Sequence, residues 1–251
     1  MAGSTLLLDE YFEREDPRFL DELYASKAEK KLQALGARWA SDARPFARAA
    51  LLSYIDDGCD RPHHRPLVKK LFKELEQKGD DEALAHFAVA FDRLVRRALV
   101  RRTRWDVAAG EVTSVTRLRT EYPAPWAGDD GVTFSLVTRQ YLRRRGFRYF
   151  RRIAHADLAR YRRGVARALA LYEDAHLARP EQLLDAWTFV HVVYGESPVI
   201  ERRARGVVVA PGRALSELEP APMFPEAWRG AFADVLGLAL AARARPVRAF
   251  A

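Results

Sequence analysis

The stretch GDDEALAHFAVAFDRLVRRALV, residues 79–100, carries the pattern that decides the fold. Its apolar residues recur every three or four positions, which is the spacing of one face of an α-helix. These positions are Leu84, Phe87, Ala88, Phe91, Leu94, Val95 and Ala98. Asp80 or Asp81 is suited to cap the first turn, because its carboxylate can accept a backbone N–H there. The stretch therefore predicts a long amphipathic helix that reaches about Ala98.

The same spacing recurs on both sides of this stretch, with short polar turns between the runs. Each run begins at serine, aspartate or proline, which are typical of helix N-termini, and Ser26 and Glu29 have the spacing of a capping box. The expected helices begin near Ser26, Pro45, Pro66, Ser135, Asp157, Pro180 and Pro225. The pattern predicts an all-α fold of about ten helices arranged as antiparallel hairpins.

Two segments interrupt the helical pattern. Residues 104–134 contain EVTSVTRLRTEY, which is rich in β-branched residues and alternates, followed by the turn-forming PAPWAGDDG. We expect a short strand-containing insertion there. Residues 195–225 give no clear period and are expected to form an irregular loop, with VVVAPG as a brief extended piece.

Two short motifs carry a family resemblance. ARPFARAALL, residues 43–52, and ARPVRAFA, residues 244–251, resemble the start of the second helix of a HEAT repeat. The resemblance implies that residues 1–251 form a single HEAT-like helical domain, an α-solenoid in which helical hairpins stack as an open array. The segments 104–134 and 195–225 depart from any regular repeat. The chain stops where a second helix should begin, so the C-terminal end is expected to be open and able to dock a protein partner.

Positive charge is concentrated in the middle of the chain. The whole sequence carries +8, whereas residues 93–167 hold 19 basic and 6 acidic residues, a net +13. All seven lysines precede Gly79, so a compositional bias towards arginine explains which basic residue is used. It does not explain why acidic residues are scarce in the same block. An anionic partner is one explanation.

The stretch RQYLRRRGFRYFRR, residues 139–152, forms the centre of this block. On a helical wheel, an apolar side with Leu142, Gly146, Tyr149, Phe150 and Ile153 is opposed by a side made of arginines. Arginines of the preceding and following helices are expected to extend this side into one stripe. The predicted nucleic-acid-binding residues are Arg93, Arg97, Arg101, Arg104, Arg144, Arg145, Arg148, Arg151, Arg152 and Arg163. The alternative is a solvated face, partly paired with acids such as Asp92, Glu173 and Asp174.

This stripe predicts a non-enzymatic scaffold that holds nucleic acid without strong sequence specificity. The guanidinium fork can bond two phosphate oxygens at once, and Tyr141, Tyr161 and Trp105 are expected to stack on bases. No helix-turn-helix, zinc-finger or RNP signature indicates sequence readout. An acidic protein surface would suit the same arginines. The alternative function is a protein–protein interaction scaffold within a larger assembly.

The sequence gives little support for an enzyme. Phosphate-binding glycine loops and the motifs GxSxG and HExxH are absent, and no cofactor is expected. Cys59, Asp60, His63 and His64 are metal-ligand types in one loop, but a second ligand pair is missing and we expect no metal. Trp187 and His191 share a helix face near Asp185, most simply as a buried, hydrogen-bonded histidine. HEAT-like DNA glycosylases combine tryptophans and an acid on a basic surface, which makes this activity a third candidate, although no motif of that family is matched.

Cys59 is the only cysteine, so an intrachain disulfide is excluded and a reducing compartment is expected. No segment has the roughly 20 apolar residues that a membrane span needs. We therefore expect a cytoplasmic protein with no membrane partner.

Overall fold

The computed structural model describes residues 4–94, 97–106, 109–120, 136–203 and 206–251. Within them the protein is mostly helical, as predicted, with two small antiparallel sheets of two strands each. The helices are α1 (Ser4–Glu13), α2 (Phe19–Ala25), α3 (Glu29–Ser41), α4 (Pro45–Asp57), α5 (Arg65–Lys78), α6 (Asp81–Arg93), α7 (Leu136–Ala156), α8 (Leu158–Ala170), α9 (Asp174–Leu177), α10 (Pro180–Asp185), α11 (Trp187–Val193), α12 (Phe232–Ala241) and α13 (Arg245–Phe250). Short 3₁₀ turns are η1 (Pro62–His64), η2 (Leu215–Glu217) and η3 (Pro225–Ala227).

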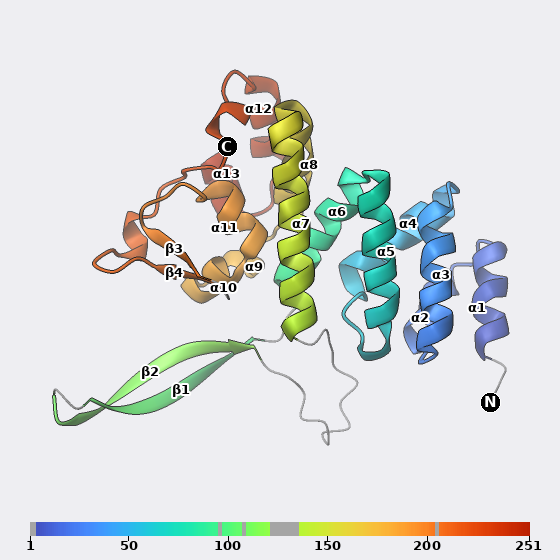
Figure 1. The fold of residues 1–251 in the computed structure, drawn as a ribbon, viewed down its shortest axis with the longest axis horizontal. Coiled ribbons are helices and arrows are strands. Elements are labelled where there is room, and N and C mark those ends of the chain that lie inside the picture. The colour runs from blue at the N-terminus through green and yellow to red at the C-terminus, as the bar shows by residue number, and fades with distance from the viewer. Residues whose placement is uncertain (1–3, 95–96, 107–108, 121–135, 204–205) are drawn as a thin grey trace.

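The helices from α1 to α8 lie side by side in a row, and the segment from α9 to α13 gathers beyond α7 and α8 at the other end (Figure 1). Alternate helices pack on one another, since α3 contacts α5, while α6 contacts both α4 and α8. Large apolar side chains fill the space between them, and Trp39, Phe72, Phe87 and Phe150 are each almost completely buried. This row holds α7 in a fixed place, with one side turned away from the packed helices.

Several helix starts follow the predicted capping chemistry. Pro45 is the first residue of α4, and the Asp80 carboxylate accepts the backbone N–H of Ala83 at 3.0 Å, capping α6. Asp157 caps α8 in the same way, through the N–H of Arg160 at 2.8 Å. Gly79 has a φ of 71°, the left-handed conformation that ends α5 without the cost an L side chain would pay.

Other predicted boundaries are wrong. The capping box at Ser26 does not form, because Ser26 follows the end of α2 and α3 begins at Glu29 without a side-chain cap. The helix predicted from Glu226 to Ala242 is divided into the turn η3 and α12, with Gly230 at a φ of 69° between them. The start predicted at Ser135 lies outside the described residues.

The largest correction concerns residues 94–104. The helix predicted to reach Ala98 ends at Arg93, and strand β1 (Arg97–Asp106) follows. It pairs along its full length with β2 (Glu111–Thr120), so the strand-containing insertion begins at residue 97 rather than 104. Leu94, Val95 and Ala98 continue the helical spacing of the sequence only by coincidence. Pairing of β1 with the β-branched strand β2 overrides this pattern. The hairpin projects away from the helices (Figure 1). The turn sequence PAPWAGDDG lies outside the described residues.

The segment predicted to be an irregular loop, residues 195–225, contains a second, shorter hairpin. Strands β3 (Ile200–Arg203) and β4 (Gly206–Val209) pair antiparallel, and β4 covers the three valines of the predicted extended piece VVVAPG. The backbone that follows this hairpin is anchored to α11, because the N–H of Ala221 donates to the carbonyl of Val193 and that of Met223 to the carbonyl of Val192. This segment therefore lies across from α7 and forms one wall of the site described next.

Candidate nucleic-acid interface

Helix α7 has the two sides that the sequence predicts. Leu142, Gly146, Tyr149, Phe150 and Ile153 are all buried against the neighbouring helices. On the opposite side Arg144, Arg148, Arg151 and Arg152 are exposed and Arg145 is half-buried. The helical period alone fixes this division, because it depends only on residues within one element.

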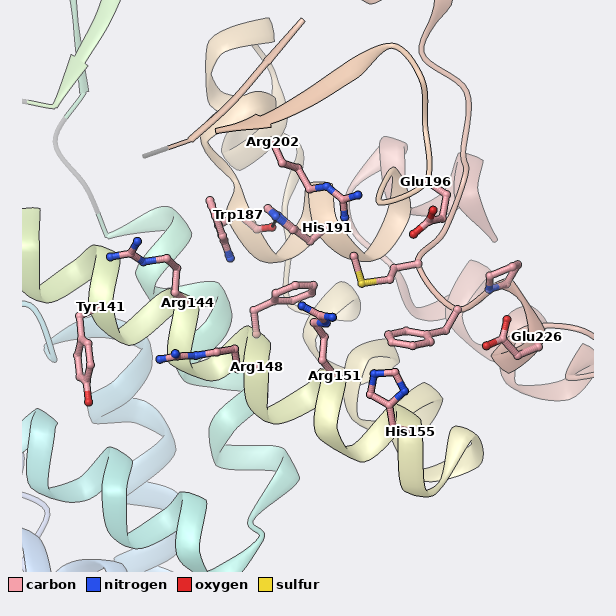
Figure 2. Close-up of a pocket in the computed structure, with 14 residues that line it drawn as sticks. Tyr141, Arg144, Arg148, Arg151, His155, Trp187, His191, Glu196, Arg202 and Glu226 are labelled. Carbon is pink, nitrogen blue, oxygen red and sulfur yellow. Dashed lines mark hydrogen bonds between the residues drawn. The ribbon is translucent and has the colours of Figure 1, made fainter. Parts of the chain in front are cut away.

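A cavity of about 1130 Å³ opens between the arginine side of α7, helix α11 and the segment 196–226 (Figure 2). Its lining residues are Tyr141, Arg144, Phe147, Arg148, Arg151, His155, Trp187, His191, Glu196, Arg202, Met223, Phe224, Pro225 and Glu226. Cavities that bind small molecules are typically about 300–1,000 Å³, so there is room for a ligand of substantial size.

Part of the cavity wall is apolar and aromatic. Phe147, Trp187 and Met223 form a small buried cluster of their own. The ring of His191 lies with its centroid 4.1 Å from that of Trp187 and 4.7 Å from that of Phe147. The indole N–H of Trp187 has no acceptor among the residues that the structure describes. A flat, uncharged ligand ring would find aromatic stacking partners at this wall, whereas the indole N–H is itself buried.

His191 is held as a neutral side chain. Its Nδ1 donates to the carbonyl oxygen of Trp187 at 2.8 Å, four residues earlier in α11, so its Nε2 is left as an acceptor. Burial is the main reason that the pKa of His191 is lowered to about 4, and the nearby guanidinium groups of Arg202, Arg143 and Arg151 lower it further. At neutral pH this ring contributes no charge to the cavity. The sequence prediction of a buried, hydrogen-bonded histidine is confirmed.

The arginines supply the charge. Arg148 and Arg151 come from α7 and Arg202 from β3, on the opposite wall (Figure 2). Among the described residues, no carboxylate lies within ion-pairing distance of these three guanidinium groups. Arg144 lines the same cavity, and its Nε donates to the backbone carbonyl of Gln140 at 3.0 Å. Like charges brought together without an ion-paired carboxylate favour an anionic ligand.

The predicted five-arginine face is thus divided between two sites. Arg145 donates through Nε to the Glu76 carboxylate of α5 at 2.6 Å, and Arg152 lies 3.7 Å from the same carboxylate. These two arginines stabilise the packing of α7 against α5. Only Arg144, Arg148 and Arg151 of the predicted face line the cavity.

The prediction that arginines of three successive helices form one stripe is wrong. Arg93 is mostly buried and pairs with Asp56 at 3.1 Å, so it joins α6 to α4. Arg97, Arg101 and Arg104 belong to strand β1 instead of a helix, and their side chains lie outside what the structure describes. Arg163 is exposed on α8 but does not line the cavity.

The predicted stacking aromatics also separate. Tyr141 lines the cavity, and Trp105 is exposed on the β1–β2 hairpin. Tyr161 is fully buried and packs edge-on against Phe224, with the ring centroids 5.3 Å apart, so it cannot stack on a base. The residues that take its place, Phe147 of α7 and Trp187 of α11, belong to one buried cluster in the cavity wall.

Two buried arginines behind the cavity were not predicted. Arg139 and Arg143 are each only 3% exposed, and both lie 3.3 Å from the Asp185 carboxylate. The guanidinium of Arg143 also sits 4.9 Å from the centroid of the Trp187 ring, a cation–π contact. The sequence contained a signal for the burial of Arg139, because this residue falls within the apolar arc of the helical wheel of α7.

The loop with metal-ligand residue types is occupied by packing contacts. Cys59 is buried, and burial raises the pKa of its thiol well above the ordinary value. His64 is buried as well, with its Nδ1 3.0 Å from the Tyr54 hydroxyl, whereas His63 lies 3.6 Å from Glu29. The adjacent histidines therefore face different neighbours. Within the described ranges, no three His, Cys, Asp or Glu side chains are grouped to hold a metal ion.

Fold and cavity together define a mostly helical protein with an arginine-lined pocket. Comparison with protein-family models, with curated proteins and with solved structures finds no match. No helix among the described residues combines the length and apolar character needed to cross a membrane. The function is therefore inferred from the pocket itself.

Proposed function

We propose that the protein is a non-enzymatic scaffold that binds nucleic acid in the cavity beside α7, without strong sequence specificity. The observation that carries the proposal is the convergence of Arg148, Arg151 and Arg202 on one cavity, with no ion-paired carboxylate among the described residues. Phosphates are ligands that suit this arrangement, because each guanidinium presents a planar fork of donors to two oxygens.

The aromatic wall favours nucleic acid over an anion without rings. Phe147, Trp187 and the neutral His191 lie within contact distance of one another beside the arginines. Stacking of a base on an aromatic side chain is worth about 1–3 kcal/mol and tolerates any base, because every base has a π-face. The arginines match the phosphate of a nucleotide and the aromatic rings match its base. A carboxylate-rich peptide would contact the arginines alone.

We also propose that α3–α8 form a HEAT-like array. Its support is the packing of alternate helices, α3 on α5 in one layer and α4 on α6 and α6 on α8 in the other. In such an array each hairpin contacts mainly its neighbours, and one layer is left open to ligands. Helix α7 would then be the last helix of the layer that begins with α3 and α5.

The test is nucleic-acid binding across a salt series, with a charge-matched pair of variants. The logarithm of affinity for a single strand is expected to fall linearly with the logarithm of salt concentration, because bound phosphates release counterions. The double variant R148A/R151A should lower the slope by about 2, one unit for each lost phosphate contact. The double variant R163A/R167A removes two exposed arginines of α8, outside the cavity, and should leave the slope unchanged.

Two results would overturn the proposal. One is the absence of binding at low salt, and the other is an equal effect of the two double variants. Polyglutamate should be added as a competitor in the same titration. If it displaced the strand as effectively as a second oligonucleotide did, the natural ligand would be an acidic protein surface instead.

A second candidate function is a protein–protein interaction scaffold, and α12 favours it. Phe232, Leu236 and Leu240 are four residues apart on this helix and are 76%, 44% and 80% exposed. An apolar row of this kind can be covered by the same row of a second copy of the chain. Sedimentation velocity over a range of concentrations tests self-association, and Leu240→Glu should abolish it if α12 is the contact.

A further inference from the structure

The charges that line the cavity are separated along its length. Arg144 and Arg148 lie at the same end as Tyr141, whereas Glu196 and Glu226 lie at the other end, beside His155 (Figure 2). Arg151 and Arg202 lie between these two ends. Neither glutamate is ion-paired with a described residue, so each presents its charge to whatever occupies the cavity.

Both glutamates are fixed by the backbone of the segment opposite α7. The N–H of Glu196 donates to the carbonyl of Ala221 at 2.9 Å. Glu226 lies in the turn η3. This turn begins directly after Phe224, whose φ of 62° is unusual for a residue other than glycine. Their position at one end of the cavity is therefore a property of the fold.

This separation of charge distinguishes between a strand that passes through the cavity and one that ends inside it. A continuous strand carries a phosphate on every nucleotide, and would place at least one beside the two carboxylates. Like charges opposed in this way cost several kcal/mol. A terminal nucleotide brings no further phosphate, and its sugar hydroxyls and base amino groups can donate to carboxylate oxygens.

We propose that the cavity binds the hydroxyl-bearing end of a single strand. The last phosphates lie on the arginines, the terminal base stacks at the wall formed by Phe147 and Trp187, and the terminal sugar donates hydrogen bonds to Glu196 or Glu226. The inference rests on the proposed function, of which it specifies the ligand. A paired base is covered on both faces by its neighbours in the duplex, so only an unpaired end offers a face to this wall.

The test is competition between three forms of one oligonucleotide, against a fluorescent strand of the same sequence. The forms are a linear strand with hydroxyl groups at both ends, the same strand closed into a circle, and the linear strand with phosphates at both ends. The linear hydroxyl form is expected to compete at least tenfold better than either of the others, since opposed charges of the kind described exceed the 1.4 kcal/mol of one decade.

A pair of variants assigns the discrimination to the glutamates. The double variant E196Q/E226Q keeps the size of both side chains and one acceptor oxygen on each but removes their charge. It should bind the three forms almost equally. Glu219→Gln serves as the control, because Glu219 is an exposed carboxylate in the same segment that does not line the cavity, and the preference should persist.

The outcomes separate this inference from the proposal on which it rests. If wild-type protein binds linear and circular strands equally, with the expected salt dependence, the end-binding inference is wrong and nucleic-acid binding stands. If it binds none of the three, both fail. Should the double variant not fold, the comparison of the three strands on wild-type protein still decides, because it needs no substitution.

Discussion

Replacing Asp92 with alanine is expected to lower the free energy of unfolding by about 3–5 kcal/mol, the usual result of removing one partner from a buried ionic network. Asp92 is 2% exposed at the C-terminal end of α6. Its Oδ2 accepts from the Tyr172 hydroxyl at 2.6 Å and from the backbone N–H of Thr188 at 2.9 Å. Alanine would leave both donors without this acceptor.

The buried arginines of α7 make the loss larger. Burial raises the pKa of Asp92, and the charges of Arg139 and Arg143 act in the opposite direction. Without the carboxylate, two guanidinium groups would stay in the interior with Asp185 as their remaining carboxylate among the described residues. An uncompensated buried charge is more costly than the loss of a hydrogen bond between neutral groups.

Urea unfolding at pH 7 measures the loss of free energy of unfolding in Asp92→Ala. Two further variants are expected to show smaller losses. Asp92→Asn keeps an oxygen that can accept both hydrogen bonds, since both donors reach the same Oδ2, so its loss should lie below that of Asp92→Ala. Tyr172→Phe removes a single O–H donor and should cost about 1 kcal/mol. If Asp92→Ala cost no more than Tyr172→Phe, the carboxylate would not be balancing the arginines, and this account of the interior would be wrong.

The same residue connects the helical row with the cavity. Thr188 is the second residue of α11, where a backbone N–H has no acceptor within the helix. The Asp92 carboxylate of α6 accepts this N–H, in the role that a capping side chain usually has. This contact explains why the helix predicted to run unbroken from Pro180 is divided at Ala186 into α10 and α11. The position of Trp187 in the cavity wall therefore depends on a carboxylate 95 positions earlier in the chain.

Helical periodicity was sufficient to predict what depends on one element. It placed Phe150 and Ile153 in the core and Arg148 and Arg151 outside it, because the two sides of α7 follow from 3.6 residues per turn. It failed at Arg93, where α6 ends because the following residues pair with a strand 20 or so positions away. A local pattern carries no information about that competition.

The opposite wall of the cavity was beyond prediction for the same reason. Arg202, Glu196 and Glu226 lie in a segment without periodicity, and hydrogen bonds to α11, which the sequence does not reveal, hold it across from α7. The arginine-rich stretch indicated an anion-binding surface but gave no indication that carboxylates close one end of it. Counting charge along the chain cannot show this, since the cavity joins residues of the basic block to residues that follow it in the sequence.

Acidification from pH 7 to pH 5 is expected to destabilise the protein by about 4 kcal/mol through two buried histidines. Burial is the first cause that lowers the pKa of His64 and that of His191, each to about 4 from an ordinary value of 6.5. Below pH 6.5 each histidine takes up a proton in the unfolded chain, whereas in the folded protein it does so only near pH 4. Because the unfolded state then binds more protons, stability falls as the pH drops from 6.5 to 4.

The magnitude follows from the same linkage. One pKa unit corresponds to 1.36 kcal/mol, and at pH 5 each histidine is about 1.5 units below its unfolded value, which gives about 2 kcal/mol for each. Urea unfolding at pH 7, 6 and 5 measures how steeply the free energy of unfolding changes with pH. Carboxylates contribute to this slope as well, as a background to the histidine contribution. Comparison with variants removes that background.

His191→Phe keeps a ring against Trp187 and Phe147 but cannot take up a proton, so it should remove about half of the histidine contribution to the slope between pH 7 and pH 5. Equal slopes for wild-type protein and His191→Phe would show that His191 is not held neutral in the folded protein. The ring would then take up a proton at the same pH as a histidine of the unfolded chain, and the aromatic wall would become charged as the pH falls below 6.5.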